Sequence, residues 1–186
     1  YMPTNDIGSV AFKRNHPTWD GRGITIGVMD SGVDLDHPAL QTTSTGERKI
    51  VDWVTATDPI FDNDLTWRLM LTQVQGATVS YGGENWTLPS STTAYRINRF
   101  TEAITAASEP GGDVNRDGDT TDRFGVLYDK ATGDVWVDAD QDHVFAASEL
   151  KRPYAENFDM GHFGDGHVDA DGTVHQMPFV VEVRKD

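Results

Sequence analysis

Apolar residues are spaced differently in the first 40 residues and in the rest of the chain. Asn5 and Asp6 are good helix N-cap residues and precede apolar residues at helical spacing, which predicts a short amphipathic helix within residues 5–19. A nearly continuous apolar run at 23–29 follows and delivers Asp30 into a glycine turn. Such a run is typical of a parallel strand buried on both faces, so the opening of the chain indicates an α/β fold.

Beyond residue 41, short runs rich in β-branched and aromatic residues alternate with turns of glycine, asparagine and aspartate, a pattern typical of antiparallel strands. The predicted strands are 49–55, 77–81, 94–100, 124–128 and 174–183. Residues 128–137 predict a hairpin around a glycine-containing loop. Only 101–108 favours a helix, which Pro110 and the next two glycines would end. The sequence therefore predicts an α/β opening over residues 1–40 and a β-rich segment over 41–186.

The composition narrows the classes of partner. The formal net charge is -15, and both phosphate backbones and anionic lipid surfaces would be repelled, so we expect neither nucleic acid nor membrane as a partner. No apolar run approaches the roughly 20 residues that a membrane helix needs. The chain has no cysteine, which excludes disulfides, thiolate metal sites and cysteine nucleophiles. Bound divalent cations would relieve the acidic excess.

Residues 23–40, GITIGVMDSGVDLDHPAL, resemble the segment of subtilisin-like serine proteases that carries the aspartate of the Asp-His-Ser triad. The glycines, the apolar run and the His37-Pro38 pair all fall where the family pattern has them. The resemblance implies that Asp30 is the triad carboxylate, which orients the catalytic imidazole. It also implies the opening part of a subtilisin-like parallel α/β sheet and a polypeptide substrate. His37 matches a structural position of the family and is not the catalytic base.

The other two triad motifs do not occur in this sequence. The family's histidine is followed by glycine, and none of the histidines here is: His16, His37, His143, His162, His167 and His175. No serine has the Gly-Thr-Ser-Met-Ala-like context of the nucleophile. A long insertion after the aspartate is similar to that of tripeptidyl peptidase II-like and large secreted actinobacterial subtilases. We therefore expect the N-terminal piece of a secreted serine endopeptidase, inactive alone, whose partner is the remainder of the catalytic domain.

Two acidic segments of the insertion are candidates for calcium, which prefers six to eight oxygen ligands. The first segment has the oxygens and the glycine of an EF-hand-like loop but Phe124 at position twelve, so Asp119 or Asp122 would have to substitute. The second has Glu149 at position twelve but His143 at the glycine position. The candidate ligands are Asp113, Asn115, Asp117, Asp119 and Asp122 in the first segment and Asp138, Asp140, Asp142 and Glu149 in the second. The alternative is that both segments are solvated turns.

Residues 161–175 mix histidine and aspartate, and two interpretations stay open for them. His162, His167 and a carboxylate offer zinc ligands, although a β-turn that carries histidines is the favoured interpretation. The whole chain also has an alternative function, as a non-catalytic calcium-binding β-module in adhesion or regulation. That alternative would make the α/β opening a leader segment without catalytic use.

Overall fold

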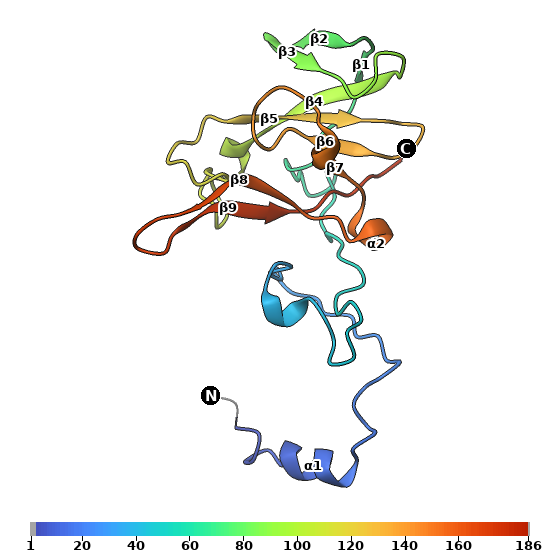
Figure 1. Ribbon diagram of the computed structural model, residues 1–186, viewed down its shortest axis with the longest axis vertical. Helices are drawn as coiled ribbons and strands as arrows, with labels where there is room; N and C mark the ends of the chain where they lie inside the picture. Colours follow the sequence, from blue (N-terminus) through green and yellow to red (C-terminus); the bar gives the residue numbers. More distant parts are fainter. Residues whose placement is uncertain (1–2, 186) are drawn as a thin grey trace. The chain divides into compact units, whose positions relative to one another are not determined.

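The computed structural model describes residues 3–185 (Figure 1). The chain divides into two compact units, one that runs up to Asp34 and one that begins at Leu35. The first unit is small and contains one regular element. The second unit contains every strand of the described residues.

Helix α1 (Ser9–Asn15) confirms the predicted helix over a shorter range. Gly8 rather than Asn5 or Asp6 occupies its N-cap, with a left-handed backbone and no side-chain cap. None of the residues of α1 is buried. Its apolar side chains are therefore not part of a core within the described chain.

The apolar run before Asp30 does not form the predicted strand. Residues 23–29 have no regular secondary structure. Ile24, Ile26 and Val28 are 69%, 78% and 79% exposed. A strand needs a neighbour for its backbone N–H and C=O groups, and the described residues supply none to this segment.

The opening of a parallel α/β sheet, predicted for residues 1–40, is not formed among the described residues, whereas the antiparallel strands predicted beyond residue 41 are present. Every named strand pair is antiparallel, and the one parallel pairing is an isolated bridge between Thr87 and Val144. The regular elements of residues 3–185 are mostly strands, together with two short α-helices, α1 and α2 (Tyr154–Asn157), and three short 3-10 helices. The physical reason is that the opening segment has no described strand beside it to pair its backbone groups, whereas the strands after residue 71 pair with one another.

A five-stranded antiparallel sheet forms the centre of the second unit. Its strands, in spatial order, are β1 (Thr72–Val74), β4 (Tyr95–Thr101), β5 (Arg123–Tyr128), β6 (Val135–Val137) and β7 (Leu150–Lys151). Two separate two-stranded sheets accompany it, β2 (Thr78–Tyr81) with β3 (Glu84–Thr87) and β8 (Gly161–Val168) with β9 (Val174–Phe179).

The central sheet carries an apolar cluster on each face. Because side chains alternate along a strand, Trp136 of β6 joins one cluster, whereas Val135 and Val137 join the other. The first cluster includes Trp86 of β3, and the second includes Phe163 of β8. The two hairpins therefore cover opposite faces of the sheet, as Figure 1 shows.

Most predicted strands of the second unit are confirmed. Strands β2, β4 and β5 match the predictions, the hairpin at 128–137 joins β5 to β6, and β9 ends at Phe179, before the predicted end. The predicted helix at 101–108 is a 3-10 helix, Glu102–Thr105. Residues 49–55 form no strand, so that prediction is wrong.

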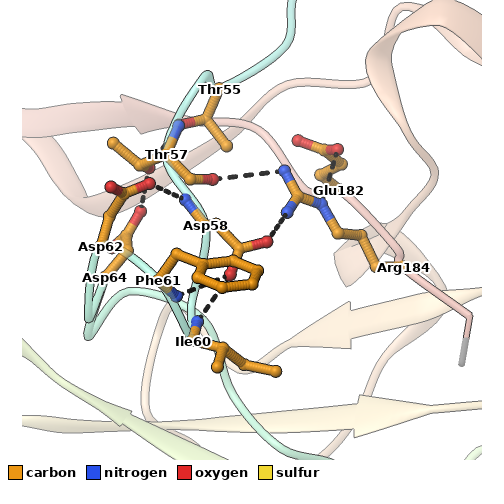
Figure 2. Close-up of polar contacts among 9 residues, drawn as sticks. All are labelled: Thr55, Thr57, Asp58, Ile60, Phe61, Asp62, Asp64, Glu182 and Arg184. Carbon is orange, nitrogen blue, oxygen red and sulfur yellow. Dashed lines mark hydrogen bonds and ion pairs between the residues drawn. The ribbon is translucent and has the colours of Figure 1, made fainter.

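A loop around Asp58 is attached to the C-terminal stretch of the chain. The Asp58 carboxylate accepts hydrogen bonds from the amides of Ile60 and Phe61 at 2.8 and 2.9 Å. Its other oxygen lies 3.0 Å from Nη1 of Arg184 (Figure 2). The Arg184 guanidinium also lies 4.4 Å from the centre of the Trp67 ring. One arginine therefore ties the loop to the chain end by charge and by a cation–π contact.

Candidate functional site

Asp30 lies on the exposed segment of the first unit. Its Oδ1 accepts a hydrogen bond of 2.7 Å from the Ser31 amide. The histidine–carboxylate contacts of residues 3–185 involve Asp36 and Asp169 instead of Asp30. Within the described residues of the first unit, no histidine is paired with the carboxylate that the sequence singles out.

The two acidic segments adopt the same backbone turn. We call residues 113–124 loop A and residues 138–149 loop B. The fourth residue of each loop is left-handed, Arg116 with φ 61° and Gln141 with φ 59°. So is the sixth, Gly118 with φ 97° in loop A and a histidine with φ 63° in loop B. The histidine that replaces glycine in loop B therefore still adopts the left-handed backbone at that position.

The first aspartate of each loop holds the turn in the same way. Oδ1 of Asp113 accepts a hydrogen bond of 3.1 Å from the amide of Asp117, the fifth residue of loop A. Oδ1 of Asp138 accepts one of 3.1 Å from the amide of Asp142, the fifth residue of loop B. The two loops are therefore built alike, although their sequences depart from the EF-hand pattern at different positions.

A buried glutamate closes each loop. In loop B, Oε1 of Glu149 accepts a hydrogen bond of 3.0 Å from the amide of Ala139, the second residue of the loop. In loop A, Oε2 of Glu102 accepts one of 3.1 Å from the amide of Val114, again the second residue. Glu102 is completely buried and lies directly after β4, outside the loop that it closes. The spacing of residues within loop A therefore could not identify Glu102 from the sequence.

The glutamates complete two compact groups of carboxylates that could hold a metal ion. One oxygen from each of Glu102, Asp119 and Asp122 lies within 4.8 Å of the others, and the same holds for Asp138, Asp140 and Glu149. The other predicted carboxylate ligands lie outside these two groups but within the loops: Asp113, Asp117 and Asp142. Asn115 of loop A donates a hydrogen bond of 2.6 Å from Nδ2 to Asp122. A cavity of about 280 Å³ reaches loop B and is lined in part by Asp140 and Glu149.

The surroundings of the Asp138 and Glu149 carboxylates in loop B destabilise their negatively charged forms. Burial raises the pKa of Asp138 to about 6, and the neighbouring Asp140 adds to the shift. Burial likewise raises the pKa of Glu149 to about 7. In loop A, burial raises the pKa of Glu102. A divalent cation would stabilise the charged forms of all three groups.

Each loop also contains a buried oxygen without a hydrogen-bond partner. These atoms are Oδ2 of Asp138 in loop B and Oδ1 of Asn115 in loop A. Asp138 is fully buried and Asn115 is 7% exposed. Buried oxygens usually find a donor, and an oxygen ligand of a hard cation such as calcium needs none. The donor set and the two free oxygens therefore fit calcium.

The third candidate region is the hairpin of β8 and β9. His162 does not join His167: its Nε2 lies 2.6 Å from Oδ2 of Asp36. His167 instead lies opposite His175 across the hairpin, and Asp169 is within ion-pair distance of both. The zinc ligands considered from the sequence, His162 and His167, are therefore not brought together.

The sequence is similar to parts of two known peptidases. It is 31% identical over 169 residues to pyrolysin of Pyrococcus furiosus, a match that covers 78% of this chain and 12% of pyrolysin. It is 48% identical over 56 residues to tripeptidyl-peptidase 2 of Oryza sativa subsp. japonica, which covers 30% of this chain and 4% of that protein. The corresponding protein of Caenorhabditis elegans is 45% identical over 47 residues, 25% of this chain and 3% of that protein.

These matches support a relationship of the chain to the subtilisin-like peptidases. The chain spans only a small part of the length of the relatives that it matches. No protein-family profile matches it, and no solved structure does. Among residues 3–185, no helix is long and apolar enough to cross a membrane.

Proposed function

We propose that this chain is the N-terminal portion of the catalytic domain of a secreted subtilisin-like serine endopeptidase, interrupted after the triad aspartate by a β-rich insertion. The match to pyrolysin carries the proposal. It covers 78% of the chain, far more than the 34 residues of the first unit, so it extends into the β-rich unit. That extent favours one peptidase segment over an unrelated calcium-binding β-module with a leader.

Asp30 has the role of the triad acid in this proposal. A triad carboxylate accepts a hydrogen bond from the imidazole, holds it in the productive tautomer and stabilises the imidazolium that forms. The imidazole would then take the proton of a serine, which attacks the peptide carbonyl to form an acyl-enzyme. The histidine and the serine come from the remainder of the catalytic domain, and the chain alone is inactive. The exposed apolar side chains at 24–28 are consistent with a strand whose sheet is that remainder.

The test uses the full-length protease that contains this segment. Asp30→Asn should lower kcat for a peptide substrate by about 10⁴-fold, because the imidazole loses its orienting carboxylate. Asp34→Asn is the matched control, since it removes an equal charge from the same turn. Full activity in the Asp30 variant, or an equal loss in both variants, would contradict the assignment.

We also propose that loops A and B bind calcium and that calcium stabilises the insertion. The support is the two compact groups of carboxylates, together with the buried oxygens that have no hydrogen-bond partner, Oδ2 of Asp138 and Oδ1 of Asn115. When bound, calcium would supply charge compensation rather than chemistry at the peptide bond. Glu149 would be a ligand in loop B and Glu102 in loop A.

Calorimetric titration of the chelator-treated chain with calcium tests the loops. We expect two sites in the wild type and one in each of Glu102→Gln and Glu149→Gln. The control variant is Glu156→Gln, which changes an exposed glutamate of α2. Calcium should also raise the melting temperature of the wild type by more than that of either loop variant. If the wild type binds no calcium, or if both loop variants keep two sites, the loops are not calcium sites.

A further inference from the structure

We propose that His162 of the β-rich insertion is a positioning residue for Asp30, the triad acid of the proposed function on which this inference rests. Nε2 of His162 lies 2.6 Å from Oδ2 of Asp36. Asp36 comes six residues after Asp30, whereas His162 lies on β8, 126 positions after Asp36. The contact therefore ties the chain just after the triad aspartate to the insertion.

The segment that carries Asp36 is folded and is attached to the insertion at a second point. Leu35 is 7% exposed, and its carbonyl accepts a hydrogen bond of 2.5 Å from Nε2 of Gln41. The segment then folds back on itself through a bridge that Arg48 completes. Nη2 of Arg48 donates a hydrogen bond of 2.9 Å to the hydroxyl of Tyr154, a buried residue at the start of α2. Two elements of the insertion, β8 and α2, therefore hold this segment.

Strand β8 is a firm support for the imidazole. Phe163, the residue after His162, is buried, and the centre of its ring lies 4.3 Å from that of Phe179 in β9 and 5.6 Å from that of Phe100 in β4. On the other side of His162, a β-carbon at Gly161 would overlap the ring of Phe179, so the strand packs directly on that ring. A side chain on a paired strand with buried neighbours is held more precisely than one on a loop.

Asp30 lies on a segment without regular secondary structure, residues 20–34. A triad carboxylate has to orient the catalytic imidazole, and a misplacement of about 1 Å can lower the rate about 10²-fold. In the full-length protease, the remainder of the catalytic domain would hold the apolar run before Asp30. The contact between His162 and Asp36 holds the chain after it. The carboxylate is then restrained from both directions along the chain.

The contact can fix the position of Asp36 without contributing much to the stability of the insertion. The side chains of His162 and Asp36 are 32% and 40% exposed. Pairs of side chains that water reaches in this way contribute little to the free energy of folding. Loss of the imidazole should therefore lower catalysis and leave the insertion folded. This difference separates a positioning role from a structural one.

The experiment measures kcat and KM for a peptide substrate in the full-length protease that contains this segment. His162→Ala should lower kcat roughly 10–100-fold with KM unchanged, because the chain after Asp30 loses its restraint. His162→Gln should restore most of kcat, since the glutamine amide can donate a hydrogen bond to Asp36 in place of Nε2. His175→Ala is the matched control: it removes a histidine of the same hairpin whose Nε2 lies 2.8 Å from Asp169, and kcat should not change.

A double variant shows whether the effect of His162 passes through Asp36. If it does, His162→Ala combined with Asp36→Ala lowers kcat no further than Asp36→Ala alone. Thermal melting should stay near that of the wild type in all of these variants. Wild-type kcat in His162→Ala, a loss that His162→Gln does not restore, or losses that multiply in the double variant would each overturn the proposal.

Asp30→Asn in the same assay separates this inference from the proposed function. Full activity of the Asp30 variant means that Asp30 is not the triad acid, and the proposed function then fails together with the inference. A large loss in the Asp30 variant with wild-type kcat in His162→Ala keeps the triad assignment and overturns the positioning role alone.

Discussion

At the scale of single residues, Gly125 lets two layers of the second unit approach each other. It lies in the middle of β5, where a β-carbon would overlap ring atoms of Trp86. Trp86 is completely buried and belongs to the apolar cluster on that face of the sheet. The absence of a side chain at one position therefore sets how closely β3 can pack on the central sheet.

Gly125→Ala should destabilise the chain by about 1–3 kcal/mol, because the new methyl group forces the indole or the strand to shift. Urea denaturation with calcium present measures the change. Gly27→Ala is the control: a β-carbon there meets no atom within 4 Å, and the effect should stay within about 0.5 kcal/mol. Equal stability of the Gly125 variant and the wild type would mean that the packing at Trp86 is looser than the structure indicates.

Some residues of the candidate sites could be identified from the sequence, and others could not. The ligand spacing of loop A and loop B is visible in the sequence because the ligands are close together along the chain. Glu102 is not visible in this way, since it precedes loop A and reaches it only after β4 and β5 have paired. No local signal distinguishes it from an exposed glutamate. The pairing of His167 with His175 depends in the same way on the register of a hairpin.

At the scale of elements, the loop around Asp58 depends on the charge of one carboxylate. Amide hydrogen bonds from Phe61 and Ile60 hold the pKa of Asp58 below its usual value, and Arg184 adds to the effect. A group with a lowered folded-state pKa stabilises the fold above its unfolded pKa and loses this contribution as the pH falls through the folded value. The contribution of Asp58 is therefore present at neutral pH and is lost in acid.

The loop should consequently loosen below about pH 4, the range in which aspartates take up protons. NMR signals of the Ile60 and Phe61 amides, followed from neutral pH downward, should move together toward the values they have in Asp58→Ala at neutral pH. Asp52→Ala changes an exposed aspartate of the same stretch and should leave both signals in place. Amide signals that stay constant through the acid range would show that the Asp58 contacts do not hold this loop.

The sequence predicted well those elements whose pattern is contained within one short stretch of the chain. The hairpin of β5 and β6 combines alternating apolar positions with a glycine turn, and both features are local. Residues 23–29 and 49–55 have the apolar pattern of strands, yet neither forms one. Apolar pattern alone describes what a segment can bury, whereas a strand also requires a partner for its backbone.

At the scale of the whole molecule, the chain consists of two units of very different order. The first unit has one helix of seven residues, and its segment 20–34 has no regular secondary structure. The second has a paired sheet with an apolar cluster on each face. The parallel sheet predicted to open in residues 1–40 is not formed at this scale, because the strand proposed to begin it has no partner among the described residues.

Limited proteolysis of the intact chain should therefore begin within residues 20–34, because unpaired exposed backbone is the preferred site of nicking. Mass spectrometry of the first products should find a resistant fragment that begins near Leu35 and contains all of β1 to β9. Near-UV circular dichroism of that fragment should keep the aromatic signal of the intact chain. First cuts inside β4, β5 or β6 would contradict the division into units.

The exposed apolar segment at 24–28 affects how the protein folds during its synthesis. Ribosomes deliver the N-terminus first, at roughly 5–20 residues per second, so synthesis of residues 35–186 takes roughly 8–30 s after Asp34 has emerged. The sheet can fold during this time from its own strands. If the segment at 24–28 pairs with later residues, as we propose, it must wait longer than the folding time of most small domains. A chaperone that binds short apolar stretches would therefore bind first to residues 24–28.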